Sequence, residues 1–167
     1  MREPRPITGA RAPLFDRLVD LDPEAARESV PQRVLDRPAV VASVAREIVR
    51  LFNTRCPHPE RPGAAATGWV LDYGVPDFGA LSAASAPDRE RYAAVLSRLL
   101  LAFEPRLSQV RIVLQPVPGE PARLRGAIAA ELRLGTVREP VSFPLLLQTK
   151  TGELSLALPD APMDASA

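Results

Sequence analysis

The spacing of the apolar residues changes at Pro105, and this change constrains the fold more than any other feature of the chain. Over 38–53 and 88–103, apolar residues return at helical spacing and polar residues fill the other face, which predicts two amphipathic helices. Beyond Pro105, apolar and polar residues alternate between short turns, which predicts antiparallel strands. Helices followed by strands predict an α+β fold, with two main helices packed on one face of an antiparallel sheet of about four strands.

Capping residues, prolines and glycines set the expected boundaries of these elements. Asp36 is the expected N-cap of the first helix, Ser85 marks the start of the second, and Pro105 ends it. A short strand or extended segment is expected at 69–73, followed by a turn over 74–77. The main strands are expected within 110–115, 124–134, 141–147 and 154–158, with turns at 116–121, 135–136 and 150–152.

The length of 167 residues suits one compact domain with short tails. We expect an N-terminal arm over 1–35, a main domain over 36–158 and a disordered tail over 159–167. The formal net charge of +1, with arginines scattered among acids, disfavours a general nucleic-acid binder. No apolar run approaches the ~20 residues that span a bilayer, and no signal-peptide pattern follows Met1, so we expect a cytoplasmic protein without membrane insertion.

The sequence offers little reactive chemistry. Cys56 and His58 are the only cysteine and the only histidine, whereas a structural zinc site needs four ligands, so no metal site is expected. The familiar nucleotide-binding, hydrolase and metalloprotease motifs do not occur, and we expect no cofactor or small-molecule ligand. Glu104 is the most suggestive acid, but nearby Arg106 would hold it ionised, whereas a general acid must carry a proton. We therefore expect no catalytic residue.

The run Glu104, Pro105 and Arg106 is the first candidate for a binding surface. Pro105 fixes the chain direction where the second helix stops. The Glu104 carboxylate, a hydrogen-bond acceptor, and the planar Arg106 guanidinium, a donor, therefore lie at a rigid corner. The pair can contact another chain, or it can form a salt bridge that closes the helix end within the same chain. The spacing alone favours the salt bridge within the chain.

An apolar island in the polar arm is the second candidate. Leu14, Phe15 and Leu18 have the spacing of a short helix between two prolines. Such an island needs a surface to cover it, and that surface is either the chain's own domain or a partner. The sequence leaves both alternatives open, and we name these three residues as candidate partner-binding residues.

Four short segments occur in a characteristic order along the chain. They are Leu-Phe-Asp-Arg-Leu at 14–18, a helical run ending in Asn-Thr-Arg at 43–55, Tyr-Gly-Val-Pro-Asp at 73–77 and Glu-Pro-Arg at 104–106. Together they resemble the TssE family of type VI secretion baseplates, over roughly residues 14 to 158. This family is related to wedge proteins of contractile phage tails, which were long labelled lysozyme-like. Phe52 and Val75 stand where leucine is commoner, and both changes are conservative.

The resemblance implies a structural subunit without enzymatic activity, in the cytoplasm at a baseplate docked on the inner membrane. It implies contacts with the baseplate proteins TssF, TssG and TssK and with the sheath proteins TssB and TssC, and no nucleic acid. It also associates Glu104, Pro105 and Arg106 with wedge assembly, which reverses the expectation from spacing alone.

We expect this subunit to join the wedge to the sheath and to seed sheath assembly. An antiparallel sheet with an unpaired edge can accept a strand from a sheath subunit, although the sequence does not identify the edge strand. The alternatives are a lysozyme-like hydrolase that cleaves peptidoglycan, or the equivalent wedge subunit of a phage tail or an extracellular contractile injection particle.

Overall fold

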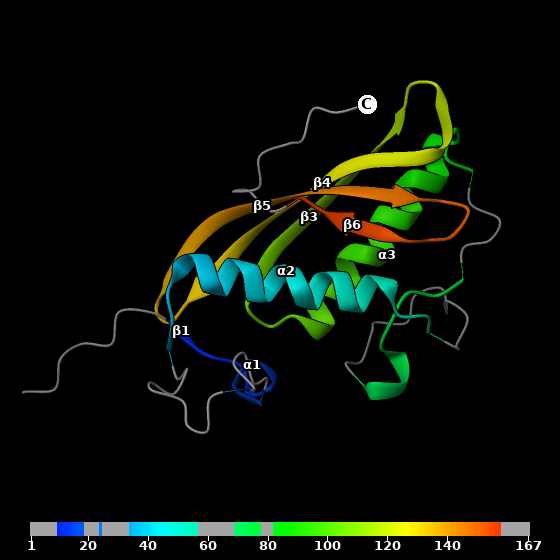
Figure 1. Ribbon diagram of the computed structural model, residues 1–167. Coiled ribbons are helices and arrows are strands. Elements are labelled where there is room, and N and C mark those ends of the chain that lie inside the picture. The colour runs from blue at the N-terminus through cyan, green and yellow to red at the C-terminus, as the bar shows by residue number, and fades with distance from the viewer. Residues whose placement is uncertain (1–9, 19–23, 25–33, 57–68, 78–81, 158–167) are drawn as a thin grey trace, which may run out of the picture.

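The computed structural model describes residues 10–18, 24, 34–56, 69–77 and 82–157. His58, the tail over 159–167 and most of the expected arm lie outside these residues. Figure 1 shows the elements β1 (Ala10–Arg11), α1 (Leu14–Leu18), β2 (Val34–Leu35), α2 (Arg37–Asn53), η1 (Val70–Asp72), α3 (Ala86–Phe103), β3 (Leu107–Val117), β4 (Glu120–Leu134), β5 (Val137–Gln148) and β6 (Leu154–Leu156).

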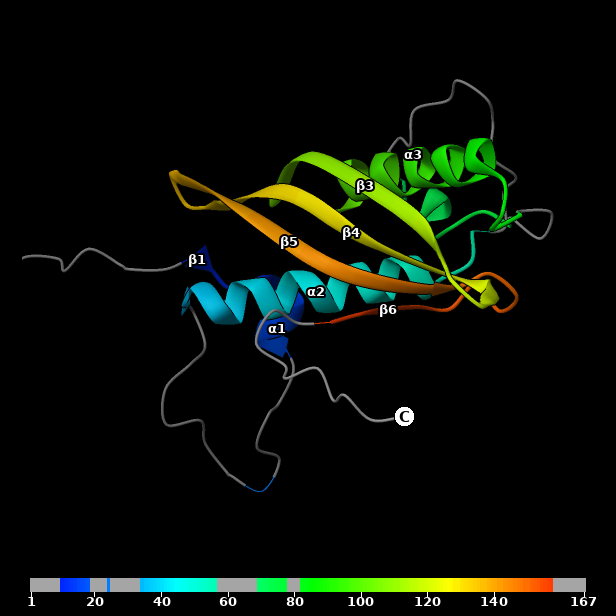
Figure 2. The same cartoon turned by 90° about the horizontal axis from the view of Figure 1, so that it is seen from above.

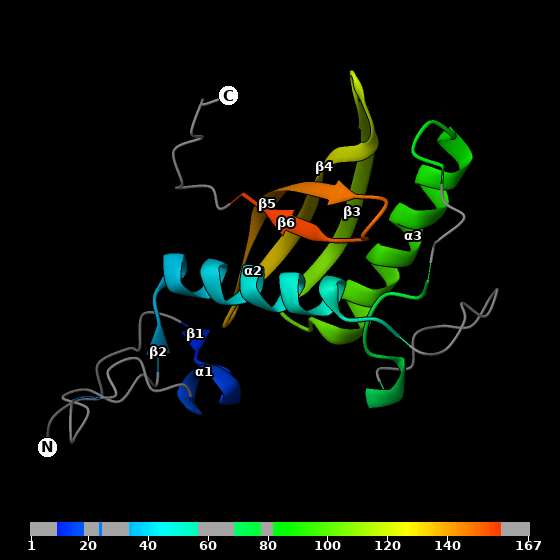
Figure 3. The ribbon, with the colours of Figure 1, turned by 45° about the vertical axis from the view of Figure 1, so that its right-hand side comes forward.

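The expected α+β architecture is confirmed. Strands β3, β4, β5 and β6 form an antiparallel sheet in sequential order, and α2 and α3 lie on the same side of it (Figure 1). Helix α3 packs on β3 and α2 lies against β6, with the two helices running in different directions (Figure 3). The opposite face of the sheet is turned toward the viewer in Figure 2, and no helix or strand of the described chain covers it.

Both long helices begin where the sequence predicts a cap. The Asp36 carboxylate accepts a hydrogen bond from the Ala39 backbone N–H at 3.0 Å, and the Ser85 hydroxyl accepts one from the Asp88 N–H at 3.3 Å. Each cap satisfies a backbone donor that the first helical turn leaves without a partner. The apolar stripes of the helices face the sheet and are fully buried at Val44, Ile48, Leu96 and Leu100.

The inner face of the sheet supplies the other half of the core. Ile128 of β4 lies between Ile112 of β3 and Phe143 of β5 in one cross-strand row. The next inner row on the β6 side joins Leu114 and Leu145 across Gly126, and the row after it pairs Leu124 with Leu147. Burying side chains of this size contributes about 1.5–3 kcal/mol each before the entropy cost of ordering them.

The first hairpin is longer than the sequence indicated. Pro116 and Pro121, which were expected in a turn over 116–121, lie within β3 and β4, and the connection is reduced to 118–119. Gly119 adopts a φ of +79°, which allows so tight a connection. Pro116 is tolerated because β3 is an edge strand and the missing N–H belongs on the side away from β4.

The expected strand at 69–73 is wrong, because this segment forms the short 3₁₀ helix η1. The Asp72 N–H donates to the Trp69 carbonyl at 2.9 Å, and the Tyr73 N–H donates to that of Val70 at 3.3 Å. No strand of the described chain runs beside the segment, so its backbone groups pair within their own turn. Extended pairing begins only at Val75, which bridges Arg55 in parallel.

Candidate partner interface

The Glu104–Arg106 corner is the most densely bonded polar site that the structure describes. Both oxygens of Glu104 accept from the Arg106 guanidinium, from Nε at 2.7 Å and from Nη2 at 2.6 Å, and the Arg106 backbone N–H adds a bond of 3.1 Å. The Glu104 side chain is only 5% exposed and that of Arg106 19%. Planar two-point pairing of this kind is the strongest geometry available to an ion pair in a protein.

The same guanidinium ties this corner to helix α2. Arg106 Nη1 donates to the Ser43 hydroxyl at 2.8 Å, and Ser43 is buried. On the other side, Arg133 of β4 donates its backbone N–H to the Arg106 carbonyl at 2.8 Å and its Nη2 to the Pro105 carbonyl at 2.9 Å. The corner therefore holds α2, α3, β3 and β4 together, as the salt-bridge alternative anticipates, and the partner role of Glu104, Pro105 and Arg106 remains a prediction.

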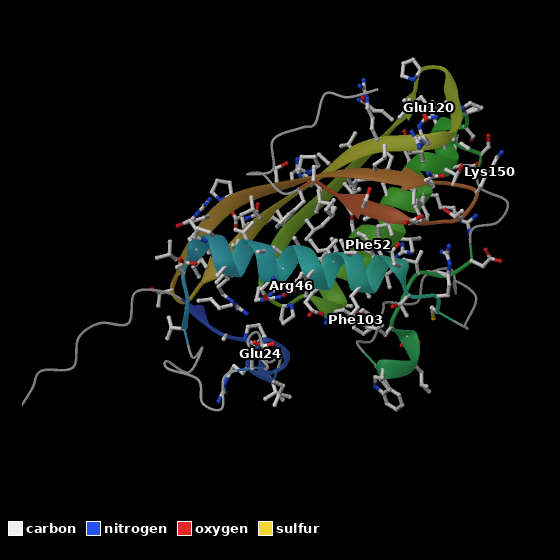
Figure 4. The ribbon with its side chains drawn as sticks, in the orientation of Figure 1. Glu24, Arg46, Phe52, Phe103, Glu120 and Lys150 are labelled. Carbon is white, nitrogen blue, oxygen red and sulfur yellow. The ribbon has the colours of Figure 1, made fainter. Side chains whose placement is uncertain are left out.

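An aromatic pair covers the α3 end of the corner. The rings of Tyr73 and Phe103 meet edge to face, with centroids 5.3 Å apart, and Figure 4 shows Phe103 at the end of α3 beside α2. Burial raises the pKa of the Tyr73 hydroxyl above its ordinary value, and the Glu47 carboxylate raises it further. The hydroxyl therefore stays protonated beside the acids of the corner.

Asn53 closes the outer margin of β6, a role that sequence reasoning missed. Its side-chain amide donates to the Leu154 carbonyl at 2.9 Å and accepts from the Leu154 N–H at 2.8 Å. The amide thus occupies the outward N–H and carbonyl of Leu154, two of the backbone groups that a further strand would use. The Asn-Thr-Arg run was the available signal, but nothing near it in the sequence identifies a partner 101 residues away.

The two residues after Asn53 hold the neighbouring turns. Arg55 Nη2 donates to the Thr151 carbonyl at 2.6 Å. The Thr54 carbonyl accepts from the Val75 N–H at 2.8 Å, which brings the chain so close at Gly74 that an added Cβ would lie 2.7 Å from that carbonyl oxygen. Gly74 also has a φ of +110°, which only glycine adopts readily, so the Tyr-Gly-Val-Pro-Asp run is explained by packing.

The two other sheet margins differ in what their backbones offer. The Ala157 N–H donates to the Pro144 carbonyl at 3.0 Å, so Pro144 faces away from β4. Because alternate residues of a strand direct their backbone groups to opposite sides, Pro140 and Ser142 face the same way. Beyond the short β6, the β5 margin thus has proline at every second outward position. Each proline removes a backbone N–H donor, which makes this margin less able to pair with another strand.

Strand β3 has a second margin without a partner in the described part of the chain, and there two consecutive outward positions keep their N–H groups. Pro116 cannot donate to β4, and by alternation Leu114 and Ile112 also direct their backbone groups outward. No described backbone group is hydrogen-bonded to this side of the strand over 111–117. The register of β3 shifts before this stretch, between Ser108 and Arg111, where Gln109 has a φ of +53°, and again at its end, between Pro116 and Val117.

The apolar island of the arm forms α1, and its leucines face solvent. Leu14 is 64% exposed and Leu18 69% exposed. The Phe15 side chain lies outside what the structure describes. Two exposed leucines on adjacent helical turns favour the docking alternative over packing on the same chain, and their partner-binding role remains a prediction.

The described residues hold no group of three or more His, Cys, Asp or Glu arranged to bind a metal ion. The two oxygens of Glu104 already accept the Arg106 donors. None of the described helices combines the length and apolar character that a bilayer crossing requires.

The described chain is thus an α+β domain with a closed ionic corner, a β6 margin bonded to Asn53 and a β3 margin without a described partner. The family model of the baseplate wedge protein gp25 matches residues 39–136. The chain therefore belongs to the baseplate wedge protein gp25 family, whose members are structural components of a baseplate. This membership confirms the resemblance to a baseplate wedge protein that the sequence motifs indicate.

Comparison with curated proteins gives no match. Among solved structures, a chain described as "The baseplate complex from the type VI secretion system" is similar, with 23% sequence identity and a TM-score of 0.42. The match covers 62% of this chain and 93% of that chain.

Proposed function

We propose that this protein is a wedge subunit of a type VI secretion baseplate, and that it seeds sheath assembly by accepting a strand from a sheath subunit beside β3. The observation that carries the proposal is the open backbone margin of β3 in a member of the baseplate wedge family. Main-chain hydrogen bonds to Ile112 and Leu114 would hold the added strand. The side chains of Ile112 and Leu114 face the core, so the register of the added strand would be set by its own side-chain contacts.

The proposed partners follow from the family resemblance. TssF, TssG and TssK are the proposed baseplate neighbours, and TssB with TssC forms the proposed sheath, at a baseplate docked on the cytoplasmic side of the inner membrane. The corner at Glu104–Arg106 and the leucines of α1 are the proposed wedge contacts. The Arg106 side chain, which is 19% exposed, and the exposed Leu14 and Leu18 support this assignment, because arginine and apolar anchors are enriched at interfaces.

Proline substitution tests the margin assignment. Ile112→Pro removes an outward N–H, whereas Ile112→Ala removes the same packing and keeps the N–H. We expect sheath assembly by TssB and TssC, followed by sedimentation and electron microscopy, to be lost with Ile112→Pro and retained with Ile112→Ala. Circular dichroism must show that both variants stay folded.

Ser142→Pro is the matched variant for the competing margin. Ser142 is exposed and directs its backbone away from β4, so proline there blocks the β5 side without disturbing the ladder. Normal sheath assembly with folded Ile112→Pro contradicts strand addition at β3. Loss of assembly with Ser142→Pro instead moves the added strand to the β5 side.

The proposal also includes the absence of enzymatic activity. Its support is the pairing of Glu104, the most suggestive acid, with the Arg106 guanidinium. We expect purified protein to leave the turbidity of a peptidoglycan suspension unchanged. Clearing that Glu104→Gln abolishes would establish the hydrolase alternative. Co-purification with TssF and TssG separates the secretion baseplate from a phage tail or an extracellular injection particle.

A further inference from the structure

The bare face of the sheet has an apolar centre. In register, Val113 of β3, Ala127 of β4 and Pro144 of β5 form one outward row, and Leu146 continues it on the next row. Val113 is 58% exposed and Leu146 36% exposed. Figure 2 views this face directly, with α2 and α3 behind the strands. A solvated sheet face usually carries polar side chains, so a central apolar row is the feature to explain.

Positive charge surrounds this row. The charged side chains that share the face in the described strands are Arg111, Arg123, Arg125, Glu131, Arg133 and Arg138. One carboxylate among so many guanidiniums contrasts with the formal net charge of +1 for the whole chain. Charge is therefore segregated onto the face that no helix covers.

Three of these arginines have no acidic partner within the described chain, and one of the three, Arg133, donates to the Pro105 carbonyl instead. Arg123 pairs with Glu120 at 2.7 Å, and Arg138 approaches Glu131 at 3.9 Å. Arg111 and Arg125 make no ion pair that the described residues supply, and they lie on the rows to either side of the Val113 row. The apolar centre thus lies between two guanidiniums whose donors are not used by any described residue and can serve a ligand.

We propose that this face docks a segment of a partner protein in which carboxylates flank apolar side chains. Guanidiniums pair with carboxylates at two points, and Val113 with Leu146 would bury apolar side chains between the two ionic contacts. Nucleic acid fits less well, because binding of single strands relies on aromatic stacking and the described residues of this face include no aromatic side chain. The proposal concerns side chains on the face, so it is independent of strand addition at the margin.

A peptide-display selection on the full chain tests this proposal. We expect random linear peptides selected on the protein to be enriched in apolar residues flanked by Asp or Glu. Their binding should weaken about tenfold or more with Arg125→Glu or Val113→Asp, and it should weaken with added salt. Arg91→Glu is the matched control, because it makes the same charge change at an exposed position on α3, behind the sheet.

Each outcome decides the matter, once circular dichroism shows that the variants are folded. Acidic apolar peptides that respond to the face variants and not to Arg91→Glu support the proposal. It is overturned if no such peptide is enriched, or if the enriched peptides bind both face variants normally. Binding of duplex DNA or of phosphatidylserine vesicles through Arg125, without peptide binding, also overturns it. Peptide binding that appears only after removal of 158–167 assigns the face to the chain's own tail instead.

Discussion

Removal of Arg106 is expected to be the most damaging single change at the corner. Arg106→Ala removes both guanidinium donors of the Glu104 carboxylate, whose side chain is 5% exposed, and leaves it only the backbone N–H of residue 106 and no positive charge. An unpaired buried charge of this kind costs about 3–5 kcal/mol. For a chain of this length, where 1 kcal/mol shifts the melting temperature by about 2–4 °C, the expected loss is about 6–20 °C.

Removal of Glu104 is expected to cost less, although it breaks the same pair. The Arg106 side chain is 19% exposed and also donates to Ser43, so it can turn its charged end toward water. We expect Glu104→Ala to cost about 1–3 kcal/mol. The double variant removes both charges, and its cost should fall below the sum of the single costs by about 1–3 kcal/mol.

Urea unfolding of the four proteins, followed by circular dichroism, measures this cycle. Arg111→Ala is the control, because an exposed arginine without an ion pair should change the free energy of unfolding by less than about 0.5 kcal/mol. An additive cycle, or an Arg106→Ala protein as stable as the control, refutes the reasoning.

The buried Leu132→Ala variant, expected to lower the free energy of unfolding by about 2–5 kcal/mol, serves as a stability-matched control for partner binding. Binding of TssF and TssG by Leu132→Ala but not by Arg106→Ala would identify a contact rather than a loss of folding.

Three further outcomes follow from single side chains. Asn53→Ala should lower the free energy of unfolding by about 1–3 kcal/mol, because two hydrogen bonds are lost. It should also speed exchange of the Leu154 amide proton, measured by hydrogen exchange, and unchanged exchange would contradict the capping role. Gly74→Ala should cost about 1–3 kcal/mol in urea unfolding, through its φ of +110° and its contact with Thr54. Burial raises the pKa of Tyr92 above 10.0, so the unfolded chain ionises first and the free energy of unfolding should fall above pH 10.0. Tyr92→Phe should reduce that fall, and a phenolate absorbance titration with an ordinary midpoint would argue against it.

Periodicity was sufficient for the architecture because it records which face of each element is buried. The stripe through Val44 and Ile48 and the alternation around Ile128 both reflect contact with the same core. The first hairpin was predicted too short because prolines usually mark turns, whereas Pro116 lies on an edge where its missing N–H costs nothing. The segment at 69–73 has strand-forming residues, but strand formation also needs a neighbouring backbone, which local sequence does not report.

The polar network was only partly predictable, for a related reason. Glu104 and Arg106 are two residues apart, so their pairing was visible as an alternative from spacing. The bonds from Arg106 to Ser43 and from Asn53 to Leu154 join segments 63 and 101 residues apart. Such contacts depend on how the helices cross the sheet, and a single sequence carries no direct signal of that crossing.

The amide of Asn53 also limits how copies of this chain can associate through their sheets. Within the described four-stranded sheet, the bond to Leu154 and the prolines of β5 disfavour head-to-tail association of two copies, because head-to-tail growth needs two complementary margins on every molecule. Pairing between two β3 margins would be self-complementary and would close at a dimer. The described four-stranded sheet therefore favours pairing through β3 alone, which disfavours open-ended fibre formation through this sheet.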